Sequence, residues 1–232
     1  MTDIKKLNED YYLNFKDRKS RDIDANSKYN NFVTLTNGLV FKNILEIGAG
    51  EGAFLEKASK LNIELYGIDI SSEAKKLCAM RKIPNLKEYN IYDGNIIPYQ
   101  NKKFDICVLS HVLEHVENER VLLYEAIRVS KKIFIEVPCE LKFRMRDFAF
   151  YNKYTHINFY TPFSVRLLLE SINLKIESIK VINYGLDYYV SIHQNNYMKG
   201  FIHKKLKDII LRITPNFAPY LFTYNCCILC KK

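Results

Sequence analysis

Residues 44–58 read ILEIGAGEGAFLEKA, and this stretch decides the fold class. A short apolar run, typical of a buried β-strand, leads directly into Gly48, Gly50 and Gly52, and a helical pattern follows. A backbone without side chains can approach a ligand closely where a Cβ atom would clash. The stretch therefore predicts a strand, a ligand-binding loop and a helix in direct succession.

Outward from this loop, strand patterns and helix patterns alternate. Alternation of this kind is the signature of βαβ units and a parallel sheet. Ser71 is expected to cap the second helix, because its hydroxyl can accept a backbone N–H. The apolar runs of strand length are 43–48, 64–70, 86–93, 104–110 and 131–138, and the helical patterns are 51–62, 71–82 and 111–130.

After Pro138 the chain becomes aromatic and basic, and we expect this stretch to form a lid or a substrate wall. A helix over 161–173 follows, with Pro162 in its first turn. Strand patterns at 174–185 and 221–230 suit the antiparallel edge that commonly closes such sheets. The predicted fold is α/β: a Rossmann-like, doubly wound seven-stranded sheet, mostly parallel with an antiparallel last strand.

We find no internal repeat and no low-complexity linker, so one domain over 1–232 is predicted. Its expected parts are an N-terminal helical cap (1–39), a cofactor-binding core (40–137), a substrate lid insertion (138–160) and the C-terminal part of the sheet with a basic helical insertion (161–232).

The amino-acid composition indicates where the protein is located and which partners it binds. No apolar run of about 18 residues occurs and the first residues lack an apolar core, so a cytoplasmic protein is predicted. Six irregularly spaced cysteines indicate reduced thiols, and the lone C-x-x-C of Cys227 and Cys230 lacks a second pair for zinc. The net charge of +9 reflects a general lysine-rich bias, and no nucleic-acid partner is expected.

Acidic residues indicate what the loop binds. Glu46 lies just upstream of the glycines, where an acid disfavours a phosphate anion and suits a ligand with positive charge. Asp69 ends the second predicted strand, where a carboxylate can accept both ribose hydroxyls. Asp93 ends the third. Acids at three strand ends predict a nucleoside pocket without a phosphate clamp.

At these residues the sequence resembles the class I S-adenosylmethionine-dependent methyltransferases. LEIGAGEG (residues 45–52) is similar to their first motif, YGIDIS (66–71) to their ribose-binding strand end, and YDGNIIPYQNKKFDICVLSHVLEHV (92–116) to the adenine acid and the segment after it. The resemblance covers about residues 40–180. A dehydrogenase-type Rossmann domain and a binding-only relic are the alternatives.

The resemblance implies S-adenosylmethionine as cofactor. Glu46 and the glycine loop would hold the aminocarboxypropyl arm, Asp69 the ribose, and Asp93 with the backbone after it the adenine. The implied cofactor-binding residues are Glu46, Gly48, Ala49, Gly50, Gly52, Asp69, Ile70, Asp93, Gly94, Asn95 and Ser110.

The stretch SHVLEHVEN, residues 110–118, raises the question of a metal site, because histidines four residues apart share one helix face. A neutral imidazole also suits removal of a proton from an oxygen nucleophile. His111 ranks first as this base, followed by His156 and His115. No metal is expected. The lesser alternative is a divalent cation on His111, Glu114 and His115, since methyltransferases of ubiquinone biosynthesis resemble this segment.

The predicted function is methylation of an oxygen on a small polar acceptor, such as a sugar or a phosphorylated precursor of a surface polysaccharide. The rivals are a tRNA or rRNA methyltransferase and a non-catalytic S-adenosylmethionine-binding protein. Residues 198–222 can form a helix with Ile202, Leu206, Ile209 and Ile213 on one face. Packing of this face on its own domain is the favoured interpretation, and peripheral contact with an anionic membrane is the second. The sequence leaves the oligomeric state open.

Overall fold

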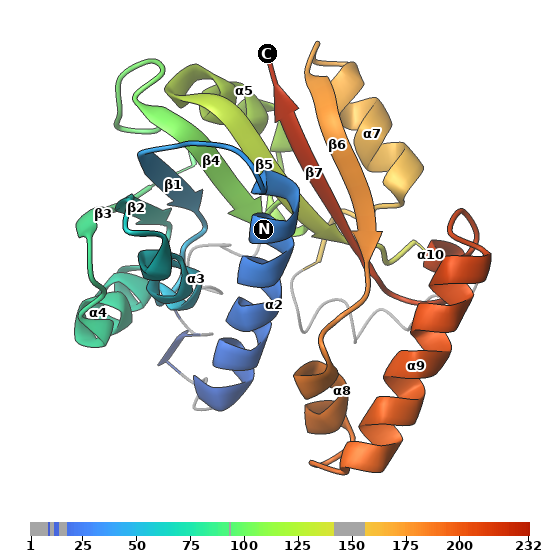
Figure 1. Cartoon of the computed structure of the whole chain (residues 1–232). Coiled ribbons are helices and arrows are strands. Elements are labelled where there is room, and N and C mark those ends of the chain that lie inside the picture. The colour runs from blue at the N-terminus through green and yellow to red at the C-terminus, as the bar shows by residue number, and fades with distance from the viewer. Residues whose placement is uncertain (1–8, 10–11, 14–17, 93, 142–155) are drawn as a thin grey trace. The chain divides into compact units, whose positions relative to one another are not determined.

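A computed structural model of the chain describes residues 9, 12–13, 18–92, 94–141 and 156–232 (Figure 1). Its sheet has seven strands in the order β3-β2-β1-β4-β5-β7-β6. β1 pairs in parallel with β2 and β4, and β2 with β3, whereas β6 and β7 are antiparallel. The predicted fold class is confirmed. The strands are β1 (Asn43–Ile47), β2 (Glu64–Asp69), β3 (Leu86–Ile91), β4 (Phe104–Ser110), β5 (Ser130–Pro138), β6 (Lys175–Ile182) and β7 (Asn225–Lys231).

The chain forms two compact units. One consists of Met1–Ser110 and Asn118–Phe134, and the other of His111–Glu117 and Ile135–Lys232. The boundary between them falls inside β5 and directly after β4. The four-part division predicted from the sequence stays a prediction.

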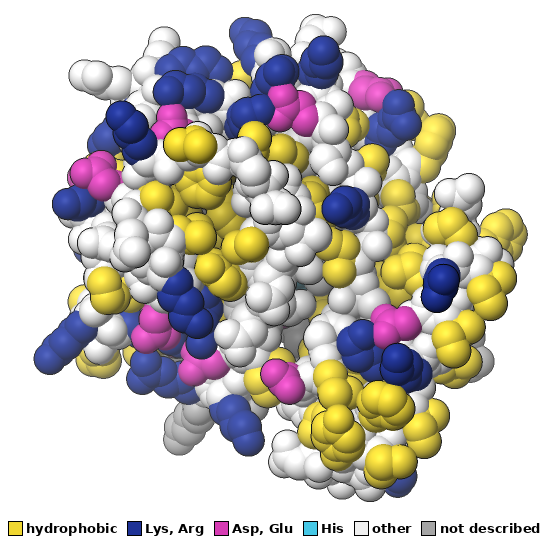
Figure 2. All heavy atoms as spheres, in the orientation of Figure 1, with side chains coloured by type: hydrophobic (Ala, Val, Ile, Leu, Met, Phe, Trp, Pro, Cys, Tyr) yellow, Lys and Arg dark blue, Asp and Glu magenta, His cyan; other side chains and the backbone are white. Residues whose placement is uncertain are grey.

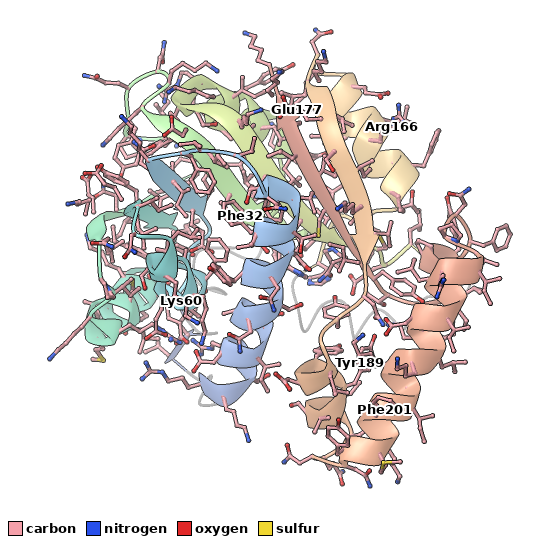
Figure 3. The ribbon with its side chains drawn as sticks, in the orientation of Figure 1. Phe32, Lys60, Arg166, Glu177, Tyr189 and Phe201 are labelled. Atoms are coloured by element: carbon pink, nitrogen blue, oxygen red, sulfur yellow. The ribbon has the colours of Figure 1, made fainter. Side chains whose placement is uncertain are left out.

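The first unit carries strands β1 to β4 and helices α2 (Arg18–Thr36), α3 (Ala53–Ala58), α4 (Ser72–Arg81) and α5 (Glu119–Val129). Phe32 of α2, labelled in Figure 3, is fully buried, and its ring meets the rings of Phe54 and Phe134 edge-on at centroid distances of 5.6 and 5.3 Å. Edge-to-face contacts of this kind add to the apolar burial. α2 is therefore part of the hydrophobic core of this unit.

The predicted cap on α4 is confirmed. The Ser71 hydroxyl accepts the N–H of Ala74 at 3.1 Å. The helix predicted over 51–62 is present as α3 and a short 3-10 turn (Ser59–Leu61), and it ends at Asn62 in the left-handed conformation. Asparagine tolerates that conformation better than most residues, which explains the stop.

The second unit carries β6, β7 and the helices α7 (Pro162–Glu170), α8 (Leu186–Ile192), α9 (Tyr197–Ile213) and α10 (Ala218–Leu221). α7 begins as predicted, with Pro162 at its first turn and a reciprocal cap between Thr161 and Ser164. The helix predicted over 198–222 divides into α9 and α10. α8 has no counterpart among the helices predicted from the sequence.

All six cysteines are free and buried. Cys227 and Cys230 lie three residues apart on β7, so their side chains leave opposite faces of the strand. This geometry does not suit a shared metal ion. None of the described helices combines the length and the hydrophobicity that a membrane span requires.

Candidate active site

The glycine loop lies at the carboxyl end of β1. Gly48, Gly50 and Gly52 all have positive φ angles, of 72°, 54° and 77°. A Cβ on Gly50 would lie 2.5 Å from the hydroxyl of Tyr12, and one on Gly52 would lie 2.6 Å from the Cys78 sulfur. The positive φ angles therefore favour glycine at all three positions, and a Cβ at Gly50 or Gly52 would also displace a neighbouring side chain.

Hydrogen bonds fasten this loop to the neighbouring strands. The N–H groups of Gly48 and Ala49 donate to the carbonyl of Ile68 at 2.9 and 3.0 Å. The Gly50 N–H donates to Asp69 Oδ2 at 2.8 Å, and the Tyr89 hydroxyl donates to the Gly50 carbonyl at 2.5 Å. These loop residues and Asp69 were predicted from the sequence as ligand-binding residues, and they lie together within the first unit.

Glu46 is buried in this region without a neutralising contact. It is 4% exposed, and its Oε2 atom receives no hydrogen bond from the described residues. Burial raises the pKa of Glu46 well above its usual range. The charge of Lys28 opposes the shift and that of Asp69 adds to it. A buried carboxyl in this state suits a ligand that brings a positive charge.

Asp69 is held differently. Burial also raises its pKa, but the backbone N–H groups of Ser71, Gly50 and Ile70 oppose the shift. Each carboxylate oxygen accepts one backbone N–H, from Ser71 to Oδ1 and from Gly50 to Oδ2. Because a carboxylate offers about four acceptor positions, Asp69 keeps capacity to accept a hydroxyl donor as well.

Glu9 is a residue at this site that the sequence analysis missed. Its carboxylate accepts the Ser71 hydroxyl at 2.7 Å and the N–H groups of Ser72 and Glu73 at 2.7 and 3.0 Å, at the start of α4. Desolvation opposes ionisation, but these hydrogen bonds outweigh it and lower the pKa of Glu9 to about 2. The contact spans more than sixty residues of chain, and no local sequence signal announces it.

The remaining residues that were predicted to bind the cofactor have fewer described contacts. Gly94 has a φ of 93° with open space where a Cβ would be, and the Asn95 carbonyl accepts the Tyr92 hydroxyl at 3.3 Å. Ser110 is buried at the end of β4, and Ile70 follows β2 directly. Asp93 lies outside the described residues.

The helix predicted over 111–130 is wrong in its first third. His111 has a φ of 58°, residues 113–115 form a 3-10 turn, and α5 begins only at Glu119. The carbonyls that a helix would use are taken by residues from later in the chain. Ile157 and Asn158 donate backbone N–H groups to the Glu114 carbonyl, and Asn158 Nδ2 donates to the carbonyls of Leu113 and Val116.

In the second unit, His111 lies between two buried carboxylates. Its Nδ1 is 3.3 Å from Glu114 Oε1, and its Nε2 is 3.7 Å from Glu136 Oε1. Both glutamates are fully buried. Burial raises the pKa of Glu114, but the imidazoles of His111 and His115 outweigh it and lower that pKa to about 2.

His156 joins this group, together with Glu140, which the sequence analysis did not name. His156 Nδ1 lies 2.6 Å from Glu140 Oε2, and its ring meets that of His115 edge-on at 4.8 Å. Possible ligand atoms of Glu114, His115 and His156 all lie within 4.8 Å of one another. The metal alternative named His111, Glu114 and His115 on one helix face. That face does not form, and His156 takes the place of His111 in the cluster.

A parallel sheet with a glycine-rich loop after its first strand and an acid after its second defines a nucleoside-binding α/β protein. The chain belongs to the methyltransferase domain family, whose model matches residues 16–179. The resemblance to class I S-adenosylmethionine-dependent methyltransferases is thereby confirmed for family and fold.

Individual relatives match the chain over shorter stretches than the family model does. The chain is 38% identical over 88 residues to the uncharacterized protein MJ1123 of Methanocaldococcus jannaschii, which covers 38% of this chain and 39% of that protein. It is 30% identical over 94 residues to ajmaline N-methyltransferase of Rauvolfia serpentina. That match covers 38% of this chain and 32% of the ajmaline enzyme. The matched region thus spans less than two fifths of either relative.

Among solved structures, the fold is similar to phosphoethanolamine N-methyltransferase 2 of Haemonchus contortus in complex with phosphomonomethylethanolamine and S-adenosylhomocysteine. The TM-score is 0.62 at 15% identity, with 97% of this chain and 60% of that one covered. At this identity the similarity concerns the fold alone.

Proposed function

We propose that the chain is an S-adenosylmethionine-dependent methyltransferase that methylates an oxygen of a small polar acceptor. The observation that carries the proposal is Glu46, a buried carboxyl beside a glycine loop, with an oxygen that no described residue satisfies. Burial without a partner is costly, and a cationic ligand removes that cost. Family membership supplies the class of reaction.

The residues of the first unit fit the cofactor. Glu46 and the loop from Gly48 to Gly52 would hold the charged amino-acid arm, and Asp69 would accept the ribose hydroxyls. The open space at Gly94 suits a flat ring beside Asn95. Ile70, Ser110 and Asp93 complete the proposed set. When bound, S-adenosylmethionine supplies a methyl group on a sulfonium.

An oxygen nucleophile must lose its proton, and the second unit offers a paired base. In this proposal, His156 Nδ1 carries a proton and donates it in a hydrogen bond to Glu140. The other ring nitrogen, Nε2, then accepts a proton from the hydroxyl of the methyl acceptor. His111, the first candidate from the sequence, and His115 then position this group through Glu114. A neutral amine would need no such base to react, so the pair favours oxygen over nitrogen.

A divalent cation is a second candidate for the same cluster. The specific observation is Glu114: it is fully buried, His111 Nδ1 lies 3.3 Å from its Oε1, and its Oε2 receives no hydrogen bond from the described residues. The Glu140–His156 pair has the form of the carboxylate–histidine arrangement that orients metal ligands. A cation on Glu114, His115 and His156 would bind the acceptor oxygens, and His111 would then be the remaining base.

The acceptor we favour is a sugar or a phosphorylated precursor of a surface polysaccharide. This choice rests on the aromatic and basic composition of residues 142–155, which lie outside the described residues. Ajmaline N-methyltransferase, by its name, methylates a nitrogen, so the relatives do not decide the acceptor atom. An RNA substrate is supported only by the net charge of +9.

Calorimetric titration tests the proposal. We expect micromolar binding of S-adenosylmethionine and S-adenosylhomocysteine and none of NAD. Asp69→Ala is expected to weaken binding by about 1–3 kcal/mol, the usual cost of losing a buried acceptor. Asp187→Ala, which removes an exposed acid from α8, serves as the matched control. Binding of NAD in place of the methyl donor would refute the assignment.

The same titrations with Mn²⁺ or Mg²⁺ separate the two roles of the cluster. A cation site predicts metal binding that is lost in Glu114→Gln, with turnover abolished by a chelator. A base without metal predicts turnover that a chelator leaves unchanged. Ligand binding without methylation of any sugar, phosphorylated acceptor or RNA would favour the non-catalytic alternative.

A further inference from the structure

α9 presents an apolar stripe to the outside of the second unit. Met198, Ile202, Leu206, Ile209 and Ile213 follow at spacings of four, four, three and four residues. At about 100° per residue, they lie within about 80° of one another around the helix. Each is between 52% and 72% exposed. Figure 2 shows hydrophobic side chains gathered over this helix together with Lys and Arg.

This orientation reverses the usual one, in which a surface helix turns its apolar stripe inward. The attached side of α9 consists of other residues, chiefly Gly200 and Lys207, the two buried ones. A Cβ on Gly200 would lie 2.7 Å from the backbone nitrogen of Val190, so α8 and α9 are in backbone contact there. The outward stripe therefore follows from how the helix is anchored.

Lys207 supplies the second anchor. Its ammonium donates to the Thr223 carbonyl at 2.7 Å and lies 4.7 and 5.1 Å from the ring centroids of Tyr224 and Tyr189. The Tyr224 hydroxyl donates in turn to the Lys207 carbonyl at 2.9 Å. Tyr189 of α8 and Phe201 of α9 are labelled in Figure 3. Cation–π contacts and a buried charged hydrogen bond hold this side of the helix inward.

Basic side chains border the stripe. On the same helical projection, Lys199 lies along one edge, and Lys205 and Arg212 lie along the other, all three exposed. The helix has one acid, Asp208, and it is bound to Lys204 and Asn183 on the flank of the helix. The outward face of α9 is thus apolar in the middle and positive at both edges.

We propose that α9 docks this protein on an anionic lipid surface, with the stripe in the headgroup and acyl boundary and the basic edges among the headgroups. Such a profile is typical of helices that lie in a membrane interface. A second copy of the chain fits less well, because a twofold interface on this stripe would bring the positive edges of the two copies against each other. This inference goes beyond the proposed methyl transfer and does not depend on it.

Vesicle sedimentation of the full chain tests the proposal. We expect binding to phosphatidylcholine vesicles that contain about 30% phosphatidylserine, little binding to pure phosphatidylcholine, and weaker binding as salt screens the basic edges. Leu206→Asp should reduce the partition coefficient at least tenfold, about the effect of losing one buried leucine. Lys205→Glu should reduce it on anionic vesicles, whereas the control Lys60→Glu should not.

Leu167→Asp is the matched control for Leu206→Asp. Leu167 lies on α7 in the same unit and is 49% exposed, against 52% for Leu206. Equal binding to neutral and anionic vesicles, or equal losses in both leucine variants, would overturn the proposal. So would a dimer in analytical ultracentrifugation that Leu206→Asp dissociates while no vesicle binding occurs, since the face would then be a protein interface. Circular dichroism of each variant shows whether it is folded.

Discussion

Single carboxyl groups mark the candidate functional residues within each of the two units. Glu46 and Asp69 could be predicted because acids at the ends of apolar strands are conspicuous in the sequence. Glu136 gave a similar signal, an acid inside the apolar run IFIEVP, and was overlooked. Glu9 and Glu140 could not be predicted, because their partners Ser71 and His156 lie 62 and 16 residues away. Only the folded chain brings such pairs together.

Glu46→Gln should stabilise the protein and abolish cofactor binding. Because burial raises the pKa of Glu46 in the folded state, ionisation at higher pH opposes folding. Below the ordinary pKa of about 4.5, the carboxyl is protonated in both the folded and the unfolded state. In that range Glu46→Gln has no stability advantage over wild type from this source. Its advantage should grow by up to about 1.4 kcal/mol per pH unit above that value and level off past the folded pKa.

Urea unfolding at about pH 4, 6 and 8, with wild type and variant side by side, measures this difference. Glu117→Gln, a change at an exposed glutamate, serves as control. A stability difference that is the same at all three pH values would contradict the proposed state of Glu46.

His156→Ala should lower turnover by about 100-fold and leave the affinity for S-adenosylmethionine unchanged, since it removes the proposed base alone. Glu140→Gln keeps a hydrogen-bonding group but loses the charge that fixes the imidazole, so we expect a smaller loss and an altered pH profile. Single-turnover experiments measure the rate of methyl transfer in both variants, and calorimetry measures their affinity for S-adenosylmethionine. Equal turnover in wild type and His156→Ala would transfer the role to His111.

At the scale of elements, the sequence predicted most strands and helix starts because their causes are local. Ser71, Thr161 and Pro162 act within one turn of the helices they begin. The segment after β4 was predicted wrongly because its pattern is helical, but its carbonyls are occupied by Ile157 and Asn158. The outward face of α9 was not the favoured prediction either, since an amphipathic pattern does not reveal which side is anchored.

Gly200→Ala should destabilise the α8–α9 pair, contrary to the usual effect of the change. Alanine normally stabilises a helix interior by about 0.5–1 kcal/mol over glycine. Here the added methyl would meet the Val190 backbone, which cannot rotate away, so we expect a net loss of about 1–3 kcal/mol.

Gly185→Ala is the control, because a Cβ there meets nothing within 4 Å and the backbone is extended. It should stay within about 1 kcal/mol of wild type. Chemical unfolding compares the two variants. A Gly200→Ala protein as stable as wild type would show that the two helices are not in tight contact.

For the molecule as a whole, the six thiols report on the integrity of the fold. Burial raises the pKa of Cys78, Cys107 and Cys230 to about 12 in each case, and all six cysteines are buried. The native protein at about pH 8 should therefore react with a thiol reagent at least 100-fold more slowly than the unfolded chain. Denaturation should release six thiols per chain.

Absorbance during thiol labelling, with and without denaturant, measures both the rate of labelling and the number of thiols that react. Fewer than six thiols after denaturation without reductant would reveal a disulfide. Rapid native labelling at one position would identify a segment that opens locally.

The fastening of the glycine loop has a kinetic consequence. Gly50 is held by Asp69 and Tyr89, and the neighbouring Glu51 is paired with Arg21 and Arg81. The loop is therefore already shaped when a ligand arrives, and no ordering step has to follow the encounter. We expect the cofactor to bind in one observable phase whose rate rises linearly with concentration, without the plateau that a slow rearrangement of this loop would impose.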